Sequence, residues 1–345
     1  MRLIQVLSML LTQLSVGTLL ATSLLPTREI RSSFFTFNSL LAAIFAGIAL
    51  VITKKLLGAA WWDVRYLGLT IIGATAAWGC FRLEKPEFGR LLLILSGLAG
   101  LVLGVLPLAA TALEARQLES TAGWLFDIGI LLGTIFLGAT HVGMILGHWY
   151  LLMRRLSFVY LERFSQLVLG AVLARALWLI VTLTLLPKLD PLLAANFIPP
   201  LWSPGGHLFF MVMRLLWGLA LPLVLAVLVL RCVAVRHNQA ATGMLYVCEI
   251  SVLFGELFAG YLLLWVPCAA GNLRGTVRAV ETKRRDVAQP GSALAWGARG
   301  REFESRRPDQ FSISYGSAPS TTRRTRPART GRFGQDAQPS GRRGA

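Results

Sequence analysis

The run FFTFNSLLAAIFAGIALVIT at residues 34–53 contains no charged side chain. An α-helix needs about 20 mainly apolar residues to cross the hydrocarbon core of a bilayer, and this run is long enough. A helix that is apolar on every side is buried either in a large protein core or in a membrane. The run therefore predicts a transmembrane helix.

Seven other stretches are apolar over a similar length. They lie at residues 3–25, 66–81, 91–112, 122–153, 166–187, 208–230 and 243–266. Of the 345 residues, 55% are hydrophobic and 15% are charged, and the mean hydropathy is +0.61. We therefore predict an all-α, polytopic integral membrane protein with about eight transmembrane helices, formed by residues 1–268. The first stretch is too long for a cleaved signal peptide, and we count it as a span.

Lysine and arginine residues in the loops indicate the orientation of the bundle. One side of the predicted bundle carries ten of them, and the side with the N-terminus carries six. Because cytoplasmic loops are enriched in basic residues, we expect the N-terminus and the end of the bundle to lie outside a bacterial inner membrane. The loop at residues 188–207 would then be an outer cap, a docking surface or an ordinary connection.

The basic charge is concentrated near the C-terminus. The net charge is +17, of which residues 1–273 contribute +7 and residues 274–345 contribute +10. This tail could be a genuine basic segment that binds RNA or anionic lipid. Its sequence favours another explanation.

Residues 285–310 resemble the conceptual translation of a proline transfer-RNA gene. Phe303, Glu304 and Ser305 can be encoded by TTC GAA TCN, which is the sequence of a T loop. Trp296 and Gly297 can be encoded by TGG GGN, which supplies the anticodon GGG, and one reading frame permits all four stems. We therefore treat residues 269–284 as an uncertain junction and expect residues 285–345 to be a disordered, out-of-gene tail with no nucleic-acid partner.

Seven ionisable side chains lie inside the predicted spans. They are Asp127, His141, His148, Arg175, Arg214, Glu249 and Glu256. A charge at the centre of a bilayer costs about 2.5–3.5 kcal/mol on insertion scales, so such groups usually form pairs or serve a ligand or proton pathway. These residues are the best sequence indication of a functional site.

Depths counted along the predicted spans suggest partners for these groups. Glu249 and Glu256 share one helix face about 10 Å apart. Arg214 matches the depth of Glu256, and we expect the two to form an intramembrane ion pair. Arg175 matches Glu249 at the inner side, with His148 near the inner interface. A purely structural pairing and a proton or substrate site remain equally open at this point, and Asp127 and His141 have no assigned partner.

The cysteine and histidine patterns argue against metal cofactors. Cys80, Cys232, Cys248 and Cys268 form no CxxC or CxxCH motif, so a zinc ribbon, an iron–sulfur site and c-type haem are not expected. His141 and His148 share one face of one helix and cannot occupy both axial positions of a single haem. We therefore disfavour haem b and expect no metal site.

The same polar groups could contact a quinone headgroup. His148, His141, Arg175 and Glu249 are the candidates, because histidine and carboxylate groups can bond to a quinone and exchange its protons. A histidine bonded only to a neighbouring helix is the alternative. The chain has no P-loop, GxSxG or HExxH motif, so we expect no catalytic activity of the isolated chain.

Two short motifs and the eight-span layout resemble the membrane-anchor subunits of dimethyl-sulfoxide-reductase and polysulfide-reductase complexes. The motifs are LTQLSVGTLLA, at Leu11–Ala21, and FNSLLA, at Phe37–Ala42. The resemblance implies a bundle with both ends outside that binds menaquinol and passes electrons to an iron–sulfur partner. The sequence therefore favours a quinone-interacting subunit of a respiratory complex.

Two other functions remain open. A small-solute or proton-coupled transporter would use the arginine and glutamate residues as a gate, and Pro107 and Pro222 could mark broken helices. The third possibility is a structural membrane protein without a ligand.

Overall fold

The computed structural model describes residues 2–56, 58, 61–108, 123–153, 157–203 and 207–285. These ranges contain helices and the turns that join them, and no strand, which confirms the all-α prediction. The predicted out-of-gene tail lies outside the described residues. The last helix continues through the predicted junction as far as Arg285.

Eight helices within the described residues are long and apolar enough to cross a membrane, as predicted. The helical segments are α1 (Arg2–Ser23), α2 (Ser32–Val51), η1 (Ile52–Leu56), α3 (Trp61–Arg82), α4 (Pro86–Gly100), η2 (Leu101–Val105), α6 (Gly123–Leu152), α7 (Val159–Leu189), α8 (Pro191–Trp202), α9 (Leu208–Leu215), η3 (Leu216–Ala220), α10 (Leu221–Ala234) and α11 (Asn238–Arg285).

Helix α2 shows how these sequences suit a lipid environment. Its small residues face inward, and Ala42 and Ala46 are completely buried. Its larger side chains face outward at helical spacing, with Leu40, Ile44 and Ile48 each more than 40% exposed. Small inward residues let helices approach closely. Exposed leucine and isoleucine side chains are unfavourable in water and favourable in the hydrocarbon core of a bilayer. The apolar surface is therefore the expected surface of a membrane protein.

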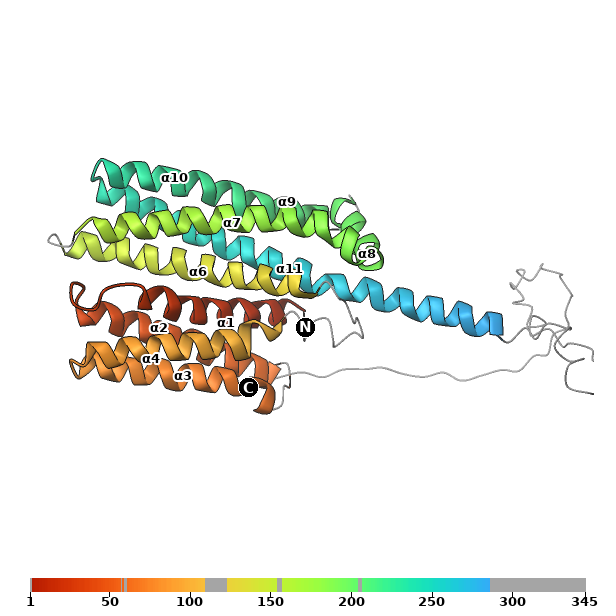
Figure 1. Cartoon of the computed structure of the whole chain (residues 1–345), viewed down its shortest axis with the longest axis horizontal. Coiled ribbons are helices and arrows are strands. Elements are labelled where there is room, and N and C mark those ends of the chain that lie inside the picture. The colour runs from red at the N-terminus through yellow and green to blue at the C-terminus, as the bar shows by residue number, and fades with distance from the viewer. Residues whose placement is uncertain are drawn as a thin grey trace, which may run out of the picture. The chain divides into compact units, whose positions relative to one another are not determined.

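Helix α1 has a central place in the bundle. It packs against α2, α4 and α6, and the remaining spans continue from α6 to α7 and from α7 to α10 (Figure 1). A Cβ atom added to Gly17 of α1 would lie 2.3 Å from the carbonyl oxygen of Thr134, and one added to Gly138 of α6 would lie 2.2 Å from the carbonyl oxygen of Gly17. Glycine is therefore required at both positions for the backbones to meet.

Two of the three π-helical segments precede a proline. Segment η2 ends two residues before Pro107, and η3 ends two residues before Pro222. Leu106 donates its N–H to the carbonyl oxygen of Leu101, five residues back, at 2.9 Å. The proline ring clashes with the carbonyl of the preceding turn, and a wider π turn accommodates that carbonyl. Pro222 therefore interrupts the seventh span without ending it, whereas Pro107 follows the end of the fourth span at Val105.

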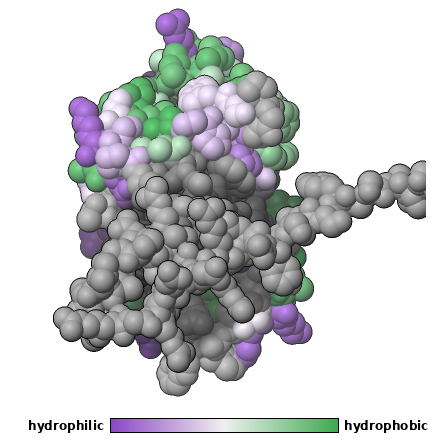
Figure 2. All heavy atoms as spheres, turned by 90° about the vertical axis from the view of Figure 1, so that its right-hand side faces the viewer, coloured by the Kyte–Doolittle hydropathy of each residue, from purple (hydrophilic) through white to green (hydrophobic). Residues whose placement is uncertain are grey.

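The loop predicted at residues 188–207 contains a helix, α8. It begins at Pro191. The first N–H groups of a helix have no acceptor within that helix, so the missing N–H of proline costs no hydrogen bond there. Pro199 and Pro200 lie inside it, which is why its sequence suggests an irregular loop. Figure 1 places α8 at the end of the bundle where α1 begins, and Figure 2 looks onto this end, where hydrophobic and hydrophilic residues both lie at the surface.

Candidate functional site

All seven ionisable groups singled out in the sequence lie on the last four spans. Helix α6 carries Asp127, His141 and His148, α7 carries Arg175, α9 carries Arg214, and α11 carries Glu249 and Glu256. The structure brings four of them together as two buried pairs.

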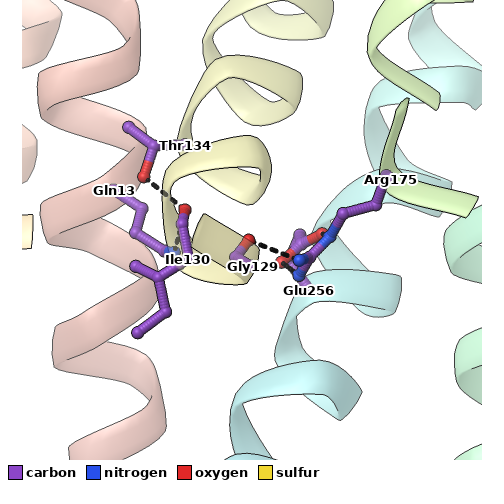
Figure 3. A network of polar contacts seen from close by, with 6 residues as sticks. All are labelled: Gln13, Gly129, Ile130, Thr134, Arg175 and Glu256. Carbon is purple, nitrogen blue, oxygen red and sulfur yellow. Dashed lines mark hydrogen bonds and ion pairs between the residues drawn. The ribbon is translucent and has the colours of Figure 1, made fainter. Parts of the chain in front are cut away.

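Arg175 and Glu256 form the first pair. The Nε of Arg175 donates to Oε1 of Glu256 at 2.9 Å, and its Nη2 donates to Oε2 at 2.7 Å. Each residue is 7% exposed. The remaining Nη1 donates to the carbonyl oxygen of Gly129 on α6, so Arg175 joins three helices (Figure 3). A two-bond arginine–carboxylate pair fixes both position and orientation.

His141 and Glu249 form the second pair. Nδ1 of His141 lies 3.1 Å from Oε1 of Glu249, and the residues are 7% and 3% exposed. The ring of Phe45 meets the imidazole edge to face, with 5.4 Å between the ring centroids. In the part of the chain that the structure describes, neither Nε2 of His141 nor Oε2 of Glu249 has a hydrogen-bond partner. Each member therefore keeps one polar atom that can bond to water or exchange a proton.

These pairings correct the expected ones, in which Arg214 paired with Glu256 and Arg175 with Glu249. The expected depth of Arg175 was counted from residue 166, but α7 begins at Val159. From the shared end of the bundle, Arg175 lies about 24 Å along α7, and Glu256 lies about 27 Å along α11. Glu249 lies about 17 Å along, which matches His141, about 17 Å from the end of α6. The pairs form between groups at equal depth.

Glycine residues on α6 make room for the arginine–glutamate pair. A Cβ atom on Gly133 would lie 2.7 Å from Oε2 of Glu256 and 3.2 Å from Nη2 of Arg175. The neighbouring turn is held by Gln13 of α1, whose Nε2 donates to the carbonyl oxygen of Ile130 at 3.2 Å (Figure 3). The pair thus lies against bare helix backbone. The sequence hinted at this only through its spaced glycines, which predicted helix packing in general.

The first pair borders a cavity. Helices α1, α6, α7, α8, α9 and α11 surround a cavity of about 60 Å³. Its polar lining consists of Gln13, Arg175, Trp178, Thr182, Arg214 and Glu256. Its apolar lining includes Met9, Leu125, Phe126, Phe197 and Met211. Pockets for small organic ligands are mostly apolar with a few placed polar groups, and this cavity has the same character. At about 60 Å³ it is smaller than their usual volume of about 300–1,000 Å³, so a ring-sized ligand requires its walls to move apart.

The other predicted site residues lie apart from this cavity or make no pair. His148 is exposed, and its ring meets that of Tyr246 with 6.5 Å between centroids. Asp127 is half-buried on α6, and none of the described residues bonds to its Oδ1. Neither residue lines the cavity. Arg214 does line the cavity, as does Glu256, with which it was expected to form an ion pair.

The described residues contain no group of three or more histidine, cysteine, aspartate or glutamate side chains that could hold a metal ion. His141 bonds to Glu249 and His148 faces outward, so the two do not converge on one ligand. The expectation against haem b stays a prediction from the sequence.

No protein-family model, curated protein or solved structure matches this chain. The chemistry of the site must therefore be judged from its own residues.

Proposed function

We propose that this chain is the integral membrane subunit of a respiratory redox complex, and that it binds a quinone in the cavity beside Arg175 and Glu256. By itself it would be non-catalytic. A partner subunit carrying an iron–sulfur or other redox centre would receive the electrons. The proposal places the chain in a bacterial inner membrane, with its N-terminus and the end of the bundle outside.

The observation that carries the proposal is the combination of an apolar cavity with a buried, charged inner wall. A quinone has a flat apolar ring and tail, and two carbonyl oxygens that accept hydrogen bonds. Arg214 and Gln13 have N–H donors at the cavity wall, and the side chains of Leu125 and Phe126 offer apolar contact. Menaquinone, with its larger ring system, fits the resemblance noted from the sequence.

The second pair suits proton exchange. Glu249 lies one heptad from Glu256 on α11, about 10 Å along the same helix face. Nδ1 of His141 lies 3.1 Å from Oε1 of Glu249, and an imidazole ring can both donate and accept a hydrogen bond, so the pair is placed to relay a proton. Both residues keep one atom unbonded within the described structure. We infer that protons released at the cavity reach this pair through water.

The end of the bundle that carries α8 is the expected docking face for the partner. Phe197 and Leu201 of α8 line the cavity, so this short helix covers one side of the ligand site. A redox centre docked on α8 would lie near the ligand, which electron transfer requires.

A proton-coupled transporter is the second candidate, and the interrupted seventh span favours it. Segment η3 breaks the regular helix two residues after Arg214, and π turns are frequent at functional sites. Transporters often place their substrates at such discontinuous helices. The two candidates differ in ligand, so one binding experiment separates them.

The test is quinone binding by the purified chain in lipid nanodiscs, with menaquinone extracted and quantified and a water-soluble menaquinone analogue titrated. Ala259 is 7% exposed and lines the cavity, so Ala259→Phe should fill it and weaken binding by at least about tenfold. Gly243 of the same helix has open space around its Cβ position, so Gly243→Phe is the matched control. No quinone binding by the wild type, or equal binding by Ala259→Phe, would refute the proposal.

A further inference from the structure

The lining of the cavity carries an excess of one positive charge. Among the described residues that line it, Arg175 and Arg214 are basic, Glu256 is acidic, and no other side chain is ionisable. Glutamine, threonine and tryptophan supply the rest of its polar surface. The imbalance is thus a property of the described residues that line the cavity.

Glu256 cannot compensate both arginines equally. Its two carboxylate oxygens each accept a hydrogen bond from Arg175, at 2.9 and 2.7 Å. Arg214 lies within electrostatic range of both members of that pair, so it meets one attractive and one repulsive charge. Among the described residues, none forms an ion pair with Arg214. The guanidinium group of Arg214 is thus available to a ligand.

A close backbone contact lies four residues from Arg214 along the seventh span. A Cβ atom added to Gly255 would lie 2.1 Å from the Cα of Gly218 in η3. The seventh span and α11 therefore touch at backbone level next to Glu256. A cation among apolar side chains is costly unless an anion compensates it. A bound anion would offset that cost for Arg214.

We propose that the cavity selects a ligand with a single negative charge, held by Arg214, on an apolar ring that lies among Leu125 and Phe126. This rests on the proposed function and states the ionisation of its ligand: an ionised hydroxyquinone or a deprotonated quinol binds in preference to a neutral quinone. Charge-assisted hydrogen bonds to arginine are stronger than those between neutral groups. Arg214 is therefore the specificity-determining residue, and Arg175 and Glu256 form the wall beside it.

The test uses two probes that differ in charge and by one methyl group. One is an alkylated hydroxynaphthoquinone, at a pH that ionises its hydroxyl group, and the other is its neutral methyl ether. Binding of each is titrated to the full-length chain in nanodiscs of zwitterionic lipid, so that the membrane surface adds no charge. The wild type should bind the ionised probe about 10- to 100-fold more tightly than the ether.

Three variants complete the test. Arg214→Gln should weaken binding of the ionised probe about 10- to 100-fold and leave the ether within about threefold. Arg214→Lys should keep most of the preference because it keeps the charge. Arg231→Gln removes the same charge from an exposed position on α10 and should change neither probe.

The outcomes separate the inference from the proposed function. If the wild type binds neither probe, the quinone site itself is wrong. If it binds both equally, or if Arg214→Gln weakens both equally, the quinone site stands and the preference for an anion is wrong. The wild-type comparison decides the question even if Arg214→Gln does not fold.

Discussion

Two glutamate residues on one face of α11 have different surroundings. Glu256 has both oxygens bonded to Arg175 and lies at the wall of a cavity. Oε1 of Glu249 lies near His141, and none of the described residues bonds to its Oε2. Glu249 is not among the described residues that line the cavity. The residues are one heptad apart and equally apolar in sequence context. Both residues carry the same carboxyl group. Their partners therefore decide the proposed difference, in which Glu256 is an anchored charge and Glu249 carries an exchangeable proton.

The difference teaches what an intramembrane acid can do. A carboxylate that receives two bonds from an arginine is strongly held in its charged form. A carboxylate that shares one bond with a histidine can lose or gain a proton with little rearrangement, because its partner can do the same. Under the proposed function, the Glu256 region would bind the ligand and the Glu249 region would exchange protons.

The largest effect should come from breaking the arginine pair. Arg175→Ala leaves Glu256 buried without its partner and should lower the free energy of unfolding by about 3–5 kcal/mol. His141→Ala should lower it by about 1–3 kcal/mol, since it removes one hydrogen-bond partner of Glu249. Unfolding in mixed detergent, followed by circular dichroism, measures both. Equal losses in the two variants would remove the distinction between the regions.

A smaller effect should follow from crowding the same pair. Gly133→Ala places a methyl group 2.7 Å from Glu256 Oε2, and we expect a destabilisation of about 1–3 kcal/mol. Gly143→Ala on the same helix would meet side chains only at 3.9 Å, and its stability should stay within about 0.5 kcal/mol of the wild type. The same unfolding assay compares them. Tolerance of alanine at Gly133 would mean that the pair does not lie against α6.

The different partners of the two acids predict a different tolerance of an amide. Glu249→Gln should cost about 1 kcal/mol of stability, because the amide can still bond to His141. Glu256→Gln should cost more, because it leaves Arg175 buried without its anion. The same unfolding assay compares the two, and a larger loss in Glu249→Gln would reverse the distinction.

The smallest effect should come from His148. Because its side chain is exposed and lies outside the cavity, His148→Ala should change stability by no more than about 0.5 kcal/mol. Titration of the menaquinone analogue should give the wild-type affinity. A loss of binding would mean that His148 belongs to the quinone site, as expected from the sequence.

The sequence predicted the spans well because length and hydropathy alone decide whether a helix suits a bilayer. It singled out the four ionisable residues that form buried pairs, but not how they pair, and it also included His148, which is exposed. A shift of one heptad separates Glu249 from Glu256, and the start of α7 at Val159 was about two turns earlier than its apolar run suggests. The polar first turns of α7 extend the helix beyond the hydrophobic pattern, so depths counted from that pattern were wrong.

Two further features escaped the sequence for local reasons. Helix α8 contains two internal prolines, which ordinarily argue against a helix. The contact of Gly218 with Gly255 depends on η3, and nothing in the hydropathy of the seventh span marks a π turn. Both features help to form the cavity, since α8 covers it and η3 holds Arg214 beside it.

The contact between Gly17 and Gly138 has a consequence for biogenesis. About 120 residues separate the two glycines, so at about 5–20 residues per second α1 waits roughly 6–24 s for its partner to be synthesised. During that wait its inner face meets lipid. The hydroxyl groups of Thr12 and Thr18 already donate to carbonyl oxygens of their own helix, at 2.8 and 2.7 Å. The first span can therefore enter the membrane alone and hold its place until the fifth span arrives.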